Sequence, residues 1–107
     1  MAKQHFFVRL LPPRPTFPQD MSEHERNLMR EHALYTRVHF EAGTVLCYGP
    51  VMARTGAYGF AVFEVENESD VRRILDDDPT VKSGLNKYDV SPMRLGGARP
   101  SAIGNSL

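Results

Sequence analysis

An uninterrupted stretch between Ser22 and Gly43 constrains the fold of this chain more than any other part of its sequence. Ser22 followed by Glu25 is typical of a capping box, in which each side chain satisfies a free backbone amide of the first helical turn. No proline or glycine follows until Gly43, which suits the position just after a helix C-terminus. The stretch therefore predicts one helix of about 20 residues.

Four short segments rich in branched and aromatic residues are typical of strands. They are residues 6–11 (FFVRLL), 44–48 (TVLCY), 60–65 (FAVFEV) and 87–93 (KYDVSPM). The first is closed by two prolines, and the second is expected to stop at Gly49-Pro50. Residues 12–20 contain too much proline for regular structure, so they are expected to form a loop.

A second, shorter helix is expected after the third strand. Asn67 or Ser69 can cap its start, and it should end near Leu75, because the residue before Pro79 is pushed out of the helical region. Residues 81–85 are expected to form a turn around Gly84. The order of elements is then β-α-β-β-α-β, an α+β fold with a four-stranded antiparallel sheet. Residues 1–95 are expected to form one domain, and residues 96–107 are expected to form a flexible tail.

Composition excludes several classes of function. The 107 residues carry 13 Lys and Arg against 13 Asp and Glu, a balance that argues against a strong electrostatic hold on nucleic acid or anionic membrane. The single cysteine, Cys47, cannot form an internal disulfide. The N-terminus lacks the apolar segment of a signal peptide, and no apolar run is long enough to span a membrane. We therefore expect a cytoplasmic protein.

The strands predict the assembly. In the first strand, Phe6, Val8 and Leu10 point to one face of the sheet, while Phe7 and Leu11 point to the other. Two helices in this chain order can cover only one face. The uncovered apolar face then needs a partner, and the sheet of a second copy is the simplest one, so we expect a homodimer packed sheet to sheet.

Histidines recur along one stripe of the long helix. At 100° per residue this stripe holds Met21, His24, Leu28, His32, Tyr35, His39 and Ala42. Its simplest interpretation is a packing surface whose imidazoles bond to nearby groups. Metal ligation is disfavoured, because two helical turns, roughly 10–12 Å, separate successive imidazoles. The acidic run Asp76–Asp78 can similarly be only a solvated helix end, although it opposes the helix dipole.

Residues 32–52 (HALYTRVHFEAGTVLCYGPVM) resemble the signature of the YCII-related family, with a helical histidine at His32, then Gly43, then Gly49-Pro50. Asp78-Pro79 followed by Gly84 resembles the Asp-Pro-x-x-x-x-Gly segment of the same family, and the resemblance extends over about residues 6 to 94. It implies a ferredoxin-like fold, dimers of the dimeric α/β barrel type, and a site in which His32 and Asp78 lie close together. The proline-rich residues 12–20 depart from the family and leave the substrate open.

Together these features predict a small enzyme with no cofactor that performs acid–base chemistry, an elimination or isomerisation, on a small polar organic molecule. His32 would be the base, and Asp78 would fix its tautomer. One alternative is a module that binds a small ligand, or only dimerises, without catalysis. Another is RNA binding, because residues 56–63 partly match the third strand of RNA-recognition motifs. The missing basic residue at Gly56 and the zero net charge disfavour it.

Overall fold

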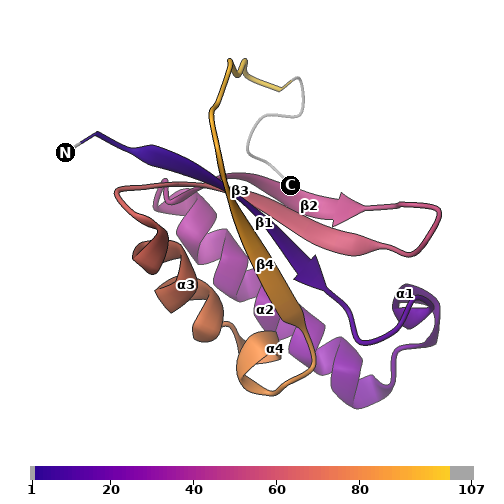
Figure 1. The fold of residues 1–107 in the computed structure, drawn as a ribbon. Coiled ribbons are helices and arrows are strands. Elements are labelled where there is room, and N and C mark those ends of the chain that lie inside the picture. Colours follow the sequence, from indigo (N-terminus) through magenta and orange to yellow (C-terminus); the bar gives the residue numbers. More distant parts are fainter. Residues whose placement is uncertain (1, 102–107) are drawn as a thin grey trace.

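The computed structural model describes residues 2–101. Its elements, in chain order, are β1 (Gln4–Leu11), α1 (Phe17–Asp20), α2 (Glu23–Glu41), β2 (Val45–Val51), β3 (Tyr58–Val65), α3 (Glu68–Asp76), α4 (Pro79–Lys82) and β4 (Lys87–Met93) (Figure 1). The strands form one antiparallel sheet in the order β2-β3-β1-β4. This is the predicted α+β, ferredoxin-like arrangement. None of the helices in residues 2–101 combines the length and apolar character needed to cross a membrane.

The long helix α2 begins and ends where its sequence predicts. The hydroxyl of Ser22 accepts a hydrogen bond from the Glu25 amide at 3.1 Å, and the Glu25 carboxylate accepts one from the Ser22 amide at 2.9 Å. After the C-cap Ala42, Gly43 adopts a φ of 86°, a left-handed conformation that favours glycine. The predicted capping box is therefore confirmed.

Residues 12–20 are more ordered than expected. They contain the single-turn helix α1, and Pro18 fits there because amides in a first turn need no helical partner. Arg14 ties the segment to α2 through hydrogen bonds to Asp20 at 2.8 Å and Glu25 at 2.7 Å. The hydrogen bond from Arg14 lowers the pKa of Glu25 to about 2. The expectation of a loop without regular structure was wrong because it weighed proline content alone.

Two further boundaries differ from the expected ones. Residues 79–82 form the short helix α4, where a turn over residues 81–85 was predicted, because the side chain of Asp78 caps it. β2 does not stop at Gly49-Pro50 but continues to Val51. It lies at the edge of the sheet, where a proline nitrogen facing outward costs no hydrogen bond. Residues 94–101 have no regular secondary structure, and the rest of the predicted tail lies outside the described residues.

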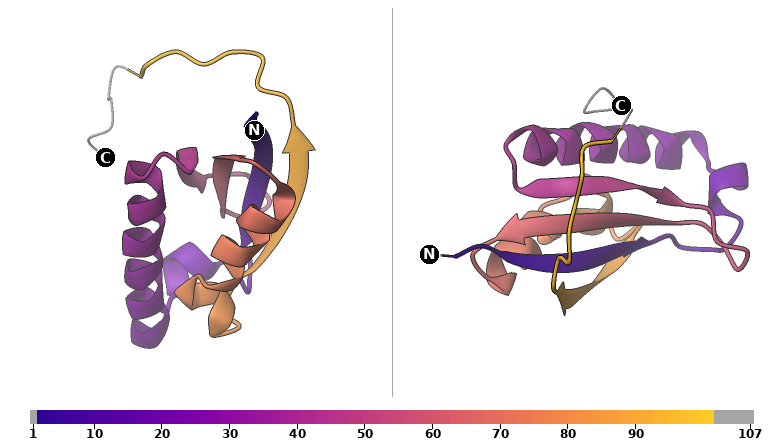
Figure 2. Two further views of the ribbon diagram at one scale, coloured as in Figure 1. Left: turned by 90° about the vertical axis from the view of Figure 1, so that its left-hand side faces the viewer. Right: turned by 90° about the horizontal axis from the view of Figure 1, so that it is seen from above.

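The helices α2, α3 and α4 lie on the same side of the sheet (Figure 2, left). α3 packs closely there: Val71 is 0% exposed and Leu75 7%, and both belong to the core with Phe6, Val8 and Phe63. By contrast none of the residues Glu23–Glu41 of α2, all of which are described, is buried. The inner face of the sheet is thus filled under α3 and incompletely filled under α2.

No helix of residues 2–101 covers the opposite, outer face of the sheet. Phe7 and Phe60 stack there with ring centroids 6.2 Å apart, and the neighbouring Val62 pairs with Phe7 across the strands. Arg9 lies on the same face and is paired with Asp89 of β4. The outer face therefore has an apolar centre and a cation that is already neutralised.

Candidate functional site

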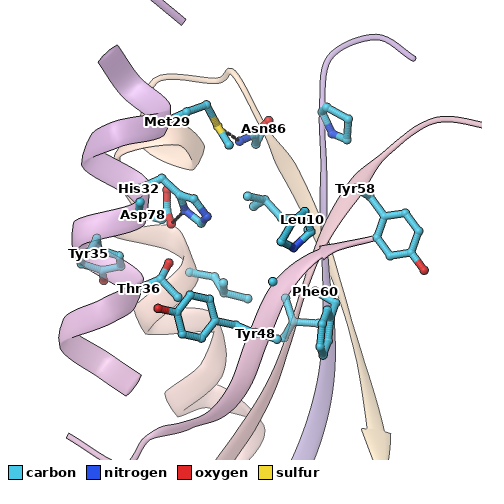
Figure 3. A pocket seen from close by; sticks show the side chains of 18 of the residues that line it. Leu10, Met29, His32, Tyr35, Thr36, Tyr48, Tyr58, Phe60, Asp78 and Asn86 are labelled. Atoms are coloured by element: carbon cyan, nitrogen blue, oxygen red, sulfur yellow. Dashed lines mark hydrogen bonds and ion pairs between the residues drawn. The ribbon is translucent and has the colours of Figure 1, made fainter. Parts of the chain in front are cut away.

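A cavity of about 500 Å³ lies between α2 and the inner face of the sheet (Figure 3). Its floor is formed by apolar side chains of the strands: Val8, Leu10, Val45, Ala61 and Phe63. The wall on the side of α2 carries the polar side chains His32, Tyr35, Thr36 and His39, which occupy positions i, i+3, i+4 and i+7 and hence lie on one helical face. Phe17, Pro18 and Met21, from α1 and the segment that joins it to α2, complete the lining.

His32 and Asp78 meet at one end of this cavity. The Nδ1 atom of His32 lies 2.6 Å from Oδ2 of Asp78, and the two side chains are 23% and 3% exposed. The other carboxylate oxygen, Oδ1, accepts hydrogen bonds from the amide and the hydroxyl of Thr80 at 2.8 and 2.7 Å. The cap of α4 therefore fixes the carboxylate, and the carboxylate fixes the imidazole.

The surroundings of Asp78 favour its ionised form. Burial alone would raise its pKa, but the hydrogen bond and charge of His32 and the two hydrogen bonds from Thr80 outweigh it, so the pKa lies below its ordinary value. Because an ionised carboxylate only accepts hydrogen bonds, Nδ1 of His32 must carry a proton. In the neutral imidazole the other ring nitrogen, Nε2, then presents a lone pair, and no described residue bonds to it.

Tyr35 joins α2 to α3 beside this pair. Its hydroxyl donates a hydrogen bond of 2.7 Å to the backbone carbonyl of Ile74. Burial, followed by the negative charges of Asp77 and Asp78, raises the pKa of the Tyr35 phenol, so the phenol remains a donor. Its ring and that of His39 form a T-shaped pair, with centroids 4.8 Å apart. Tyr35 is therefore engaged in holding the wall of the cavity.

Three other polar groups of the lining are not engaged in this way. The hydroxyls of Thr36 and Tyr48 have no hydrogen-bond partner among residues 2–101, and Figure 3 shows the Tyr48 hydroxyl directed towards Thr36. The amide of Asn86, which is 3% exposed, donates to the Met29 sulfur at 3.5 Å, and its carbonyl oxygen has no partner in the described part of the chain.

The structure separates the candidate residues that the sequence singled out. Of the three stripe histidines, His32 and His39 line the cavity, while His24 is exposed. Of the acidic run only Asp78 lies there: Asp77 is exposed, and Asp76 accepts a hydrogen bond from Tyr88 at 2.6 Å. Within residues 2–101 no three His, Cys, Asp or Glu side chains are placed to hold a metal ion.

Sequence reasoning missed Thr36, Tyr48 and Asn86. Thr36 carried a signal, because it lies one turn after His32 and so shares its face of the helix. Tyr48 carried a weaker one, since it precedes Gly49-Pro50 in a strand whose bulge between Val45 and Cys47 resets which residues face inward. Asn86 follows a turn, and no pattern in the sequence around it indicated a place in the cavity.

Comparison with known proteins relates the chain to a family and a fold. No curated protein matches the sequence. Among solved structures the chain is similar to 5-chloro-2-hydroxyhydroquinone dehydrochlorinase from Burkholderia phenoliruptrix, solved in complex with 2,5-dihydroxybenzoquinone. That match has a TM-score of 0.60 and 20% identity, and it covers 85% of this chain and 95% of the other. An uncharacterised protein from Thermotoga maritima aligns with a TM-score of 0.48 and 12% identity, over 87% and 100% of the two chains. The model of the YCII-related domain matches residues 5–94, so this chain belongs to the YCII-related family.

Proposed function

We propose that this protein is an enzyme that performs acid–base chemistry, an elimination or an isomerisation, on a small organic molecule bound in the cavity under α2. One observation carries the proposal: an imidazole oriented by a buried carboxylate presents its free nitrogen beside a space large enough for a substrate. His32 is the base and Asp78 is its positioning residue. A sealed packing contact would need no such space.

The geometry suits removal of a proton. Nε2 of His32 takes a proton from the substrate, the released electron pair forms a new π bond, and the bond to the leaving group breaks. A correctly placed base of this kind contributes about 10²- to 10⁴-fold to a rate. Asp78 holds the tautomer in which Nε2 is unprotonated, and it stabilises the imidazolium that forms.

The similar dehydrochlorinase offers a first substrate. Loss of hydrogen chloride from 5-chloro-2-hydroxyhydroquinone, the reaction in that protein's name, is an elimination of the class proposed here. The likeness between the two chains is one of fold, so the compound serves as a probe. Chloride release can be followed directly, together with panels of related chlorinated hydroquinones.

The test compares two histidines of the same helix. We expect His32→Ala to lower chloride release at least 100-fold, and Asp78→Asn to lower it by a comparable factor, while circular dichroism shows folded protein. His24→Ala removes an exposed imidazole and should leave the rate unchanged. Turnover that survives in both His32→Ala and Asp78→Asn would end the proposal. Binding of the probe without turnover by the wild type would favour a non-catalytic ligand-binding module.

A further inference from the structure

Resting on the function proposed above, we infer the chemical class of the substrate from the lining of the cavity. It is an uncharged, largely apolar ring compound that carries at least two hydroxyl groups. One hydroxyl lies at His32, and the second lies about one helical turn away, between Thr36 and Tyr48.

The charges of the cavity exclude anions. Among the described residues that line it, none is lysine or arginine, and Asp78 is the one with a fixed charge. If His32 takes up a proton, it forms a neutral pair with Asp78, because the two side chains are in direct contact. A carboxylate or phosphate in this cavity would lose hydration without gaining a lysine or arginine as a partner, which is unfavourable. Acids, nucleotides and phosphate esters therefore do not fit.

The shape and polarity of the cavity favour a ring. An apolar cavity of about 150 Å³ is enough to bind benzene, so one of about 500 Å³ holds a substituted ring with room to spare. The floor offers only aliphatic and aromatic contacts from the strands, whereas hydrogen-bonding groups lie mainly on the side of α2. A ligand matched to this lining has apolar faces and polar groups along one edge.

The polar groups lie at two points of that edge. Thr36 is four residues after His32, so about 6 Å of helix rise separates the two positions. Tyr48 extends from β2 towards Thr36 and is held from the side by Phe40, with ring centroids 5.4 Å apart (Figure 3). Since neither hydroxyl has a partner among residues 2–101, both are free to bind a second substituent of the ligand.

A ligand with hydroxyl groups, which both donate and accept hydrogen bonds, matches this lining better than a ligand that carries acceptors alone. In the neutral imidazole Nε2 of His32 presents a lone pair, and so does the side-chain oxygen of Asn86, which is buried at the same end of the cavity (Figure 3). A buried acceptor without a donor costs about 1–3 kcal/mol. The Asn86 amide is held by a weak contact with the Met29 sulfur, so it can turn about its Cβ–Cγ bond towards a bound hydroxyl.

Equilibrium binding tests this assignment without any turnover. We would titrate the full chain by calorimetry at pH 8 under nitrogen with phenol, 4-hydroxybenzoate and the three dihydroxybenzenes hydroquinone, resorcinol and catechol. At least one dihydroxybenzene should bind tenfold or more tightly than phenol. 4-Hydroxybenzoate should bind at least tenfold more weakly than phenol, because its carboxylate has no cation to meet.

Two tyrosine variants locate the second hydroxyl. Tyr48→Phe removes a single oxygen from the cavity and should abolish the advantage of the best dihydroxybenzene over phenol. Tyr88→Phe removes a phenol outside the cavity and should preserve that advantage. The assignment is wrong if 4-hydroxybenzoate binds as tightly as phenol, if no dihydroxybenzene exceeds phenol, or if Tyr48→Phe keeps the advantage. The proposed acid–base function fails separately, when turnover is insensitive to His32→Ala.

Discussion

The two halves of the inner sheet face differ in what covers them. Under α3, a helix of 9 residues, the face is sealed by Val71 and Leu75. Under α2, a helix of 19 residues, the same face is open, and none of the 19 described side chains is buried. The longer helix therefore contributes less to the core than the shorter one.

The chemistry of the facing side chains explains this difference. α3 presents branched apolar residues to the strands, and the removal of these side chains from water is favourable. α2 presents two imidazoles, a phenol and a hydroxyl, which need hydrogen-bond partners when buried, whereas the strands line the cavity mostly with apolar side chains. Helix α2 therefore stands away from the sheet, and the space that results is the candidate site.

The largest expected effect comes from a mutation in the packed half of the inner face, under α3. Val71→Ala should lower the free energy of unfolding by about 2.5 kcal/mol, because Val71 is fully buried in the packed core and does not line the cavity. Met29→Ala shortens a side chain that lines the open cavity and should cost less than about 1 kcal/mol. Urea denaturation followed by circular dichroism measures both. Equal losses would mean that the two halves are packed alike.

A smaller effect concerns the outer face of the sheet. We propose that a second copy covers it and buries more than about 1,200 Å² in total. Phe7→Asp places a charge at the apolar centre and should raise the dissociation constant about 30-fold, or about 2 kcal/mol. Leu34→Asp is the control, because Leu34 lies on α2 and is 71% exposed. It should leave the dissociation constant unchanged. A wild-type monomer at micromolar concentration in sedimentation would contradict this assembly.

The smallest expected effect is the contribution of Asp78 to stability as pH changes. Because its pKa is lower in the folded chain than in the unfolded one, its stabilisation is complete above about pH 5 and is lost as pH falls through the folded pKa. Asp78→Asn should therefore cost about 1 kcal/mol at pH 7 and less at pH 3. Asp77→Asn, at an exposed carboxyl, should show no such difference. A cost that is the same at both pH values would show that this carboxylate does not titrate as described.

Much of this molecule could be predicted from local sequence, because local interactions determine it. Ser22, Glu25 and Gly43 define α2 through contacts within a few residues, and the alternating strands define the sheet. The contact between His32 and Asp78 came from the family resemblance, since 46 positions separate the two residues. The participation of Tyr48 and Asn86 could not be predicted, because it depends on a strand bulge and on how far α2 stands from the sheet.

The proline that lies within β2 has a consequence for how the sheet can grow. β2 and β4 are the two edge strands, and each contains one proline, Pro50 and Pro92. A new strand adding at either edge would meet a backbone nitrogen that has no hydrogen to donate, and its ladder would be interrupted there. Lateral extension into a continuous intermolecular sheet, the route to fibrous aggregation, is therefore disfavoured at both margins.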